Sequence, residues 1–282
     1  MSRRKRRNEL VRPFVKWVGG KRQLLAEIKR YIPQQFSRYY EPFVGGGAVL
    51  FHLQPKKAVI NDSNEELVNL YEVIKKAPDK LIQELKEHKN EEAYFYEIRG
   101  LDRDKALYRK LNNIQRASRI IYLNKTCYNG LFRVNSAGEF NSPFGRYKNP
   151  NIVNEITIRA VSNYLAHNDI RILNTDYEKA LANIRKGSFV YFDPPYDPVS
   201  NSANFTGYTK GGFGRDEQAR LKSVCDRLDE RGVKFLLSNS ATDFIKELYA
   251  DYSVSIVHAN RAVNSKANGR GKIAEVLIRN YA

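Results

Sequence analysis

A carboxylate, two prolines and a phenol ring stand together at Asp193, Pro194, Pro195 and Tyr196, directly after the apolar residues 188–192. The apolar run is typical of a buried strand, and prolines cannot extend a strand ladder, so the turn lies at the strand's carboxyl end. Ligands of open α/β sheets bind at that end. The Asp193 carboxylate and the Pro194 carbonyl can accept both hydrogens of a planar amine while Tyr196 stacks on its ring, which suits the amino group of a nucleobase. A strand followed by a proline-rich turn of no further role is the alternative that these residues alone leave open.

A second candidate ligand site is the glycine run at residues 45–47, which lies within residues 39–51 between a short strand and the start of a helix. Glycines at such a turn let the backbone approach a nucleotide, although they also occur where the chain only packs tightly. The strand expected next in the chain ends in Asp62, at a spacing that suits an acid binding ribose hydroxyls. The dinucleotide motif G-x-G-x-x-G would need glycine at Leu50, so a pyrophosphate site is not indicated.

The single tryptophan of the chain, Trp17, lies between Lys16 and Lys21. Lysine can hold a carboxylate and indole can cover an apolar group, so this segment suits the amino-acid end of a cofactor. A buried aromatic side chain at the start of a domain is the other interpretation. The segment ends in a Gly-Lys pair, but a phosphate-binding loop would require glycine at Val15 and serine or threonine at Arg22. We therefore reject phosphate transfer.

The composition indicates a polyanionic partner. The formal net charge of the 282 residues is +17 and the pI is about 9.7. Aromatic residues make up 12% of the chain and can stack on bases, so nucleic acid is the favoured partner. A basic protein that is merely soluble is the alternative. The 42% of hydrophobic residues suffice for the core of one large or two modest domains.

The sequence shows no pattern of export, of a membrane span or of a metal site. Cys127 and Cys225 are too few for a disulfide framework, and no Cys/His group has metal-ligand spacing. No apolar run is long enough to cross a bilayer, and no hydrophobic segment follows the basic residues 3–7. We expect a reduced, metal-free intracellular protein with a basic arm over residues 1–10, which either lies along phosphates or is a solvated tail.

Alternating strands and helices must position these candidate residues. Residues 11–65 and 168–282 both show strand-helix alternation, which predicts an α/β fold. Residues 66–167 differ, because their apolar residues have helical spacing and a Gly- and Asn-rich hairpin follows. The clearest helical stretches are residues 65–76, 80–86 and 116–123. We expect Phe132 and Phe140 of the hairpin to pack on the helices.

The hairpin, residues 128–147, carries side chains that can read DNA. A sheet edge with nucleoside pockets can perform chemistry but cannot choose a sequence, so a separate element must reach base edges. Arg133 can bond a guanine bidentately, and Asn129 can pair with a base edge. Tyr128 and Leu131 are suited to wedge into the base stack.

Four motifs, in this order, resemble those of the Dam/DpnII-like DNA adenine methyltransferases. They are Pro-Phe-x-Lys-Trp-x-Gly-Gly-Lys at 13–21, Glu-Pro-Phe-x-Gly-Gly-Gly at 41–47, Asn-Asp at 61–62 and Asp-Pro-Pro-Tyr at 193–196. Residues 124–148, 174–177 and 271–278 are also similar to family segments. The resemblance implies a Rossmann-like class I methyltransferase sheet, formed by residues 11–65 and 168–282. An inserted, mainly helical DNA-recognition domain with a β-hairpin is then expected at 66–167.

The resemblance also implies a cofactor, a target and site residues. The cofactor is S-adenosyl-methionine, and the target is adenine within GATC in double-stranded DNA. The catalytic residues are Asp193, Pro194 and Tyr196. The cofactor-binding residues are Trp17, Lys21, Phe43, Gly45, Gly47, Asp62, Asp176, Tyr177 and Asp193. The DNA-binding residues are Lys16, Tyr128, Asn129, Leu131, Arg133 and Pro143.

Individual roles follow from the same resemblance. Lys16 contacts the first guanine, Asp62 binds the ribose, and Asp176 with Tyr177 holds the adenine of the cofactor. Trp17 and Lys21 hold its methionine part. A solvent-exposed helix-capping aspartate is the alternative interpretation of Asp176.

The chemistry can be argued from the residues. The exocyclic amine of adenine is a poor nucleophile because its lone pair is conjugated into the ring. Two acceptors localise that lone pair and in-line positioning supplies much of the rest, so no covalent enzyme intermediate is needed. Carbon-5 methylation of cytosine would need a thiol in a Pro-Cys pair, whereas Cys127 follows Thr126 and Cys225 follows Val224. The adenine must leave the duplex stack, with Tyr196 as its stacking platform.

Two other functions stay open on the sequence. Methyltransferases of protein amide nitrogens carry Asn-Pro-Pro-Tyr at this turn, and both Asp193 and the basic charge oppose that function. A DNA-binding protein without turnover is the second, and the presence of every polar catalytic position opposes it. We expect a cytoplasmic, nucleoid-associated enzyme of bacterial or phage origin, with a cognate restriction endonuclease acting separately as a candidate partner.

Overall fold

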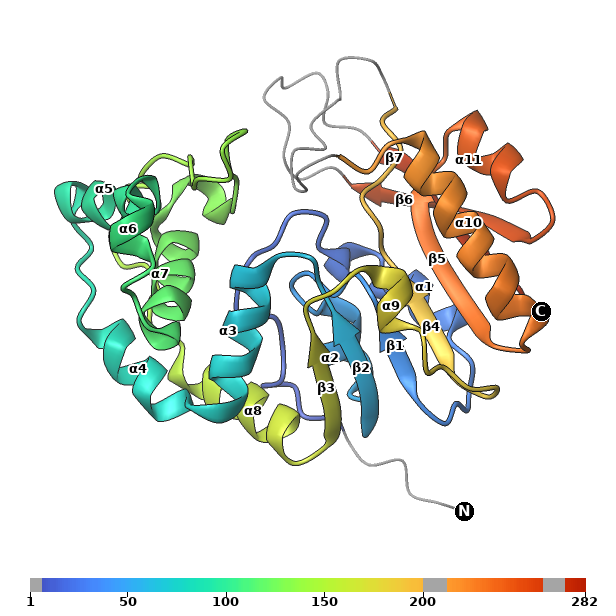
Figure 1. The fold of residues 1–282 in the computed structure, drawn as a ribbon, viewed down its shortest axis with the longest axis horizontal. Coiled ribbons are helices and arrows are strands. Elements are labelled where there is room, and N and C mark those ends of the chain that lie inside the picture. Colours follow the sequence, from blue (N-terminus) through green and yellow to red (C-terminus); the bar gives the residue numbers. More distant parts are fainter. Residues whose placement is uncertain (1–6, 200–211, 261–271) are drawn as a thin grey trace.

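The computed structural model describes residues 7–199, 212–260 and 272–282 (Figure 1). The strands are β1 (Tyr39–Glu41), β2 (Lys57–Asn61), β3 (Asp169–Leu173), β4 (Phe189–Phe192), β5 (Lys234–Ser240), β6 (Ser253–Asn260) and β7 (Lys272–Arg279). The α-helices are α1 (Leu25–Tyr31), α2 (Ala48–Leu53), α3 (Glu65–Lys76), α4 (Pro78–Lys86), α5 (Glu92–Gly100), α6 (Lys105–Tyr108), α7 (Asn113–Thr126), α8 (Glu155–Ala166), α9 (Tyr177–Ala180), α10 (Arg215–Glu230) and α11 (Asp243–Leu248). The 3₁₀ turns are η1 (Lys21–Gln23), η2 (Leu101–Arg103) and η3 (Tyr128–Gly130).

The strands form one seven-stranded sheet in the order β3-β2-β1-β4-β5-β7-β6. The first five strands in this order, β3, β2, β1, β4 and β5, are parallel to one another, and β7 is antiparallel to both β5 and β6. The register aligns Tyr39 of β1 with Ala58 of β2 on one side and with Phe189 of β4 on the other. Because the strand order reverses between β1 and β4, their carboxyl ends form the switch point at which open α/β sheets bind ligands. The predicted α/β sheet is confirmed.

The central strands are buried on both faces, which explains their continuous apolar runs. Phe189 and Tyr191 of β4 belong to one hydrophobic cluster, and Val190 and Phe192 to a second one on the opposite face. Side chains alternate across a strand, so a strand covered on both sides must be apolar at every position. Helix α10 covers the second face with buried residues that include Leu221.

The first cluster continues from the sheet into the helices between β2 and β3. These helices, α3 to α8, lie to one side of the sheet in Figure 1, with α3 and α8 next to β3. Buried residues of α3, α4 and α7 share the cluster with β1 and β4, and Phe132 and Phe140 belong to it too. The predicted packing of Phe132 and Phe140 on the helices is therefore confirmed. One continuous apolar core connects this helical segment to the sheet.

Helix ends in this segment follow local sequence signals. Asn64 caps α3 by accepting the Leu67 amide hydrogen. Asn112 and Gln115 form a capping box at the start of α7. Such caps satisfy amides that have no partner within the helix.

Candidate active site

The polar residues singled out in the sequence follow the carboxyl ends of neighbouring parallel strands. Asp62 follows β2, Asp176 lies beyond β3, and Asp193 follows β4 directly. The glycine run follows β1, between β2 and β4 in the sheet. The topology thus brings segments that are far apart in the chain together at the carboxyl ends of the parallel strands.

The Asp193 carboxylate is held through one of its two oxygens. The Lys21 ammonium lies 2.7 Å from Oδ1, and the Ser238 hydroxyl donates to the same oxygen at 3.2 Å. Burial raises the pKa of Asp193, and the charge and hydrogen bond of Lys21 oppose that rise. In the part of the chain that the structure describes, no hydrogen bond reaches Oδ2 of Asp193 or the carbonyl of Pro194. Neither of the two acceptors that the sequence predicts therefore has a hydrogen-bond partner among the described residues.

Tyr196 is fixed at both its hydroxyl and its ring. The hydroxyl donates to Oε2 of Glu275 on β7 at 2.6 Å. The Lys21 ammonium lies over the ring, 4.6 Å from its centroid, and also donates to the Gly19 carbonyl at 2.6 Å. A base that stacks on Tyr196 must therefore use the other ring face or displace Lys21.

The glycine run packs tightly against aromatic side chains. Gly45 and Gly47 have φ values of +48° and +70°. A Cβ at Gly45 would lie 3.2 Å from the Trp17 ring, and one at Gly47 would lie 2.5 Å from the Tyr71 hydroxyl. Trp17 in turn stacks on Phe132 with ring centroids 4.5 Å apart. Tight packing, one of the two interpretations of the glycines, is therefore present, and Trp17 lies between this loop and the predicted hairpin.

Asp62 is fixed by the backbone around it. Its Oδ2 accepts the Gly45 amide hydrogen at 3.0 Å and its Oδ1 accepts that of Asn64 at 2.9 Å. Burial raises the pKa of Asp62, and these two bonds lower it. The neighbouring Asn61 bonds the carbonyls of Pro42 and Thr175, so it connects the loops that follow β1 and β3.

Asp176 caps α9 by accepting the Glu178 amide hydrogen, so the capping that the alternative predicted is present, although the side chain is only 33% exposed. Its two oxygens also accept hydrogen bonds from Arg220 at 2.7 and 3.1 Å. The Arg220 guanidinium lies over the Tyr177 ring, which is 5.1 Å from the Phe43 ring. Asp176, Tyr177 and Phe43 thus form one aromatic and acidic cluster beside the strand ends.

The structure brings four of the predicted DNA-binding residues together. The Lys16 ammonium donates to the Asn129 carbonyl, and the Tyr128 amide donates to the Pro143 carbonyl at 2.8 Å. Tyr128, Asn129 and Pro143 are exposed, with 60% of the Tyr128 surface accessible. The side chain of Asn124 bonds both backbone groups of Lys16, which ties the N-terminal segment to α7.

Arg133 lies on the predicted hairpin, which the structure forms as a turn with isolated antiparallel bridges at Val134–Phe140 and Cys127–Phe144. A continuous two-stranded ladder is absent from residues 128–147. Nε of Arg133 donates to Asn141 Oδ1 at 2.8 Å, and the Asn141 amide donates to the Arg133 carbonyl at 2.9 Å.

Several residues of the site were not singled out from the sequence. Ser238, Glu275 and Arg220 contact Asp193, Tyr196 and Asp176. Glu275 lies in a segment that resembles the family, and that resemblance was the one signal available for it. The other two lie on β5 and α10, whose sequences show ordinary strand and helix patterns.

The structure also bears on metals, membranes and the basic arm. Over residues 7–199, 212–260 and 272–282, no group of three or more His, Cys, Asp or Glu side chains could hold a metal ion. No helix in this described part has the length and apolar character needed to span a membrane. The arm residues 1–6 lie outside the described residues.

Comparisons with known proteins give the family. The model of the D12 class N6 adenine-specific DNA methyltransferases matches residues 17–263. The type II methyltransferase M1.LlaDCHI of Lactococcus lactis subsp. cremoris is 45% identical over 273 residues, covering 96% of each chain. The type II methyltransferase M.MjaIII of Methanocaldococcus jannaschii is 42% identical over 292 residues, covering 96% of this chain and 99% of that protein. The DNA adenine methylase of Escherichia coli K12 is 34% identical over 270 residues, covering 94% of each chain.

These matches cover both the strand ends around Asp193 and the helical segment with Arg133. The seven-stranded, mostly parallel sheet is consistent with a class I methyltransferase, and family membership implies S-adenosyl-methionine as the methyl donor. The chain belongs to the D12 class N6 adenine-specific DNA methyltransferases, and it is an enzyme that methylates adenine in DNA.

Proposed function

We propose that this enzyme methylates the exocyclic amine of adenine within GATC in double-stranded DNA, by direct transfer to a base that has left the stack. The observation that carries the proposal is a pair of acceptors at one turn, Asp193 Oδ2 and the Pro194 carbonyl, which have no hydrogen-bond partner among the described residues and lie beside the strand switch point. An acceptor pair of this kind suits an amine with two hydrogens.

The residues around the turn fit the cofactor that the family implies. S-adenosyl-methionine, when bound, supplies an activated methyl group on a sulfonium. Each Asp62 oxygen accepts one backbone hydrogen bond and retains capacity for a ribose hydroxyl. The rings of Phe43 and Tyr177 can cover a purine, and Asp176 can bond its edge. The remaining cofactor-binding residues in this proposal are Trp17, Lys21, Gly45, Gly47 and Asp193.

Asp193 and Pro194 perform the activation. Their oxygens accept the two amine hydrogens, which draws the nitrogen lone pair out of conjugation and directs it at the electrophile. The charge and hydrogen bond of Lys21 favour the ionised form of the partly buried Asp193, because they oppose the rise in pKa that burial causes. Tyr196 holds the flipped base by stacking, and its bond to Glu275 fixes the ring.

Target recognition is assigned to residues 66–167 together with Lys16. The exposed residues Tyr128 and Pro143 are joined by a backbone hydrogen bond, and the Lys16 ammonium bonds the carbonyl of the neighbouring Asn129. Leu131 and Arg133 follow on the same hairpin. Arg133 has its Nε occupied by Asn141, while no hydrogen bond involves its two terminal nitrogens among the described residues. A guanidinium held in this way suits the bidentate reading of guanine.

The names of two relatives support a proposal for the cellular setting. The proteins from Lactococcus lactis and Methanocaldococcus jannaschii carry type II methyltransferase names. A cognate restriction endonuclease that acts separately is therefore our proposed partner in the cell. We place the enzyme in the cytoplasm, associated with the nucleoid.

The test is transfer of a tritiated methyl group from S-adenosyl-methionine to oligonucleotide duplexes. A GATC duplex should accept methyl groups, and duplexes with any one of the four bases changed should accept far fewer. Equal labelling of all duplexes would refute the GATC proposal. Base flipping is tested separately by replacing the target adenine with 2-aminopurine, whose fluorescence should rise on binding because a flipped base loses its quenching neighbours.

A further inference from the structure

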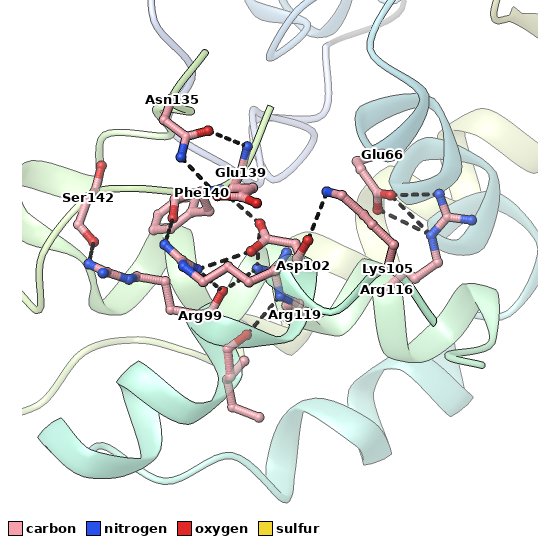
Figure 2. A network of polar contacts seen from close by, with 12 residues as sticks. Glu66, Arg99, Asp102, Lys105, Arg116, Arg119, Asn135, Glu139, Phe140 and Ser142 are labelled. Carbon is pink, nitrogen blue, oxygen red and sulfur yellow. Dashed lines mark hydrogen bonds and ion pairs between the residues drawn. The ribbon is translucent and has the colours of Figure 1, made fainter. Parts of the chain in front are cut away.

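A buried carboxylate lies beneath the hairpin, outside the catalytic and cofactor residues (Figure 2). Asp102 in η2 is 7% exposed, and its Oδ2 accepts the backbone amide hydrogen of Phe140 at 2.8 Å. The same oxygen lies 2.9 Å from Arg119, which is 3% exposed, and Oδ1 lies 3.1 Å from Arg103. A charged side chain that is so deeply buried needs polar partners, and one partner of Asp102 is a backbone amide of the hairpin.

Arginines of the same segment hold the hairpin carbonyls. Arg103 donates to the Phe140 carbonyl at 3.0 Å, so Asp102 and Arg103 together bind both backbone groups of one residue. Arg99 donates to the Ser142 carbonyl at 3.2 Å. Figure 2 shows Arg99 of α5 and Asp102 of η2 on the side of the hairpin residues Phe140 and Ser142. Arg119 on α7 completes the network through the carbonyls of Ile98 and Arg99.

Phe140, which the network holds, is adjacent in the chain to Asn141, which orients Arg133. Phe140 bridges to Val134, and the next residue, Asn141, bonds both the carbonyl and the Nε of Arg133. A shift of Phe140 therefore moves Asn141 and, with it, the Arg133 guanidinium. Arg99, Arg103 and Arg119 bond groups of the protein itself in this network. Arginines on a surface could instead bind DNA phosphates.

We propose that Asp102, Arg103 and Arg119 are positioning residues for base selection, which fix the hairpin so that Arg133 meets its base in one geometry. The inference rests on the proposed role of Arg133 in reading DNA. A polar network with every member paired is rigid, and recognition through two hydrogen bonds requires a donor held to a fraction of an ångström. Loss of the network should therefore affect which sites are methylated more than whether methylation occurs.

Arg103→Gln is the variant to test. A change at Asp102 would leave Arg119 buried without its carboxylate and could unfold the protein, whereas the Arg103 side chain is 37% exposed. The control is Arg159→Gln on α8, because Arg159 also makes two carboxylate contacts, with Asp79 and Glu155, but has no contact with the hairpin among the described residues. Full-length variants are compared by methylation of a randomised duplex library, in which each methylated adenine is read with its flanking bases.

Arg103→Gln should lower the preference at the base pair read by Arg133 by about fivefold or more, less than the full loss of a bidentate contact. S-adenosyl-methionine binding should stay within about twofold of wild type. The base position should be the one that Arg133→Ala relaxes, and the double variant should relax it no further than Arg133→Ala alone, since both changes act through one side chain. A variant that is only less stable would not relax the same base position as Arg133→Ala, and its effect would not disappear in the double variant.

Two results would overturn the inference. One is a preference profile for Arg103→Gln that matches those of wild type and Arg159→Gln. The other is a relaxation spread over all positions and additive with Arg133→Ala. The library also separates this inference from the GATC proposal: a wild-type preference for another sequence refutes GATC, while the comparison between variants still decides the role of the network.

Discussion

Replacing Asp193 by asparagine tests whether the turn works as a pair of acceptors. The side chains have the same shape, but the amide keeps one oxygen and replaces the other with a donor group. Lys21 and Ser238 both donate to Oδ1. The amide oxygen of the variant must therefore take the Oδ1 position, because a donor there would face two other donors. The NH₂ group then occupies the Oδ2 position and faces the amine of the target base.

The expected loss follows from this geometry. One of the two acceptors for the amine hydrogens becomes a donor, and only the Pro194 carbonyl remains. Losing one such transition-state hydrogen bond costs roughly 2.7–4 kcal/mol, which is about 10²–10³ in rate. Asp193→Asn should therefore be nearly as slow as Asp193→Ala, although it preserves an oxygen. Ser238→Ala removes only one donor to Oδ1 and leaves Lys21 in place, so its loss should stay within about tenfold.

The assay is single-turnover transfer of a tritiated methyl group to a duplex, at saturating enzyme and cofactor. Cofactor binding to each variant is measured in parallel by calorimetry, and DNA binding by fluorescence anisotropy, so that the chemical step is separated from binding. An Asp193→Asn enzyme that transfers methyl groups within tenfold of the wild-type rate would refute the assignment of Oδ2 as an acceptor.

Three further predictions concern specificity, packing and pH. Arg133→Ala should cost about 1–3 kcal/mol of discrimination at one guanine in competition binding, with a smaller loss on unrelated DNA; a uniform loss on all sequences would make Arg133 a phosphate contact. Phe132→Ala should lower the free energy of unfolding in urea by about 3–5 kcal/mol, because the ring is 4% exposed and packs on Trp17 and Phe140; a loss under 1 kcal/mol would contradict that packing. Burial lowers the pKa of His88 from 6.5 to about 4. Between these two pH values the imidazole is protonated in the unfolded chain and neutral in the folded one. Stability should therefore fall by up to about 3 kcal/mol from pH 6.5 to 4, and His88→Gln should show a smaller fall.

Local patterns predicted the elements well. The helix expected over residues 65–76 is α3 (Glu65–Lys76), and the strand expected over residues 188–192 is β4 (Phe189–Phe192). In both cases the spacing of apolar residues directly reflects which faces are buried. The hairpin was harder, because its short bridges depend on Asp102 and Arg103, which lie more than thirty residues earlier in the chain.

In the candidate site, too, residues next to strand ends were predictable, whereas contacts between distant segments were not. Residue types at strand ends indicated Asp62 and Asp193, and the family resemblance added Asp176; all three follow parallel strands, whose carboxyl ends lie together. Contacts between distant segments were not predictable, among them the bond from Tyr196 to Glu275 and the pairing of Lys21 with Asp193. The sequence separates these partners by many elements, and no periodic pattern encodes which side chains meet.

The charges at this edge of the sheet are costly for folding. Burial raises the pKa of Glu41, Asp193 and Glu275, and the charge of Asp193 raises that of the other two further. The Lys21 charge opposes all three increases. A core needs no such arrangement, because apolar residues of similar size would pack there without the desolvation of ions. Buried carboxylates whose pKa values respond to one ammonium, next to a strand switch point, are typical of a functional site that is maintained at the expense of stability.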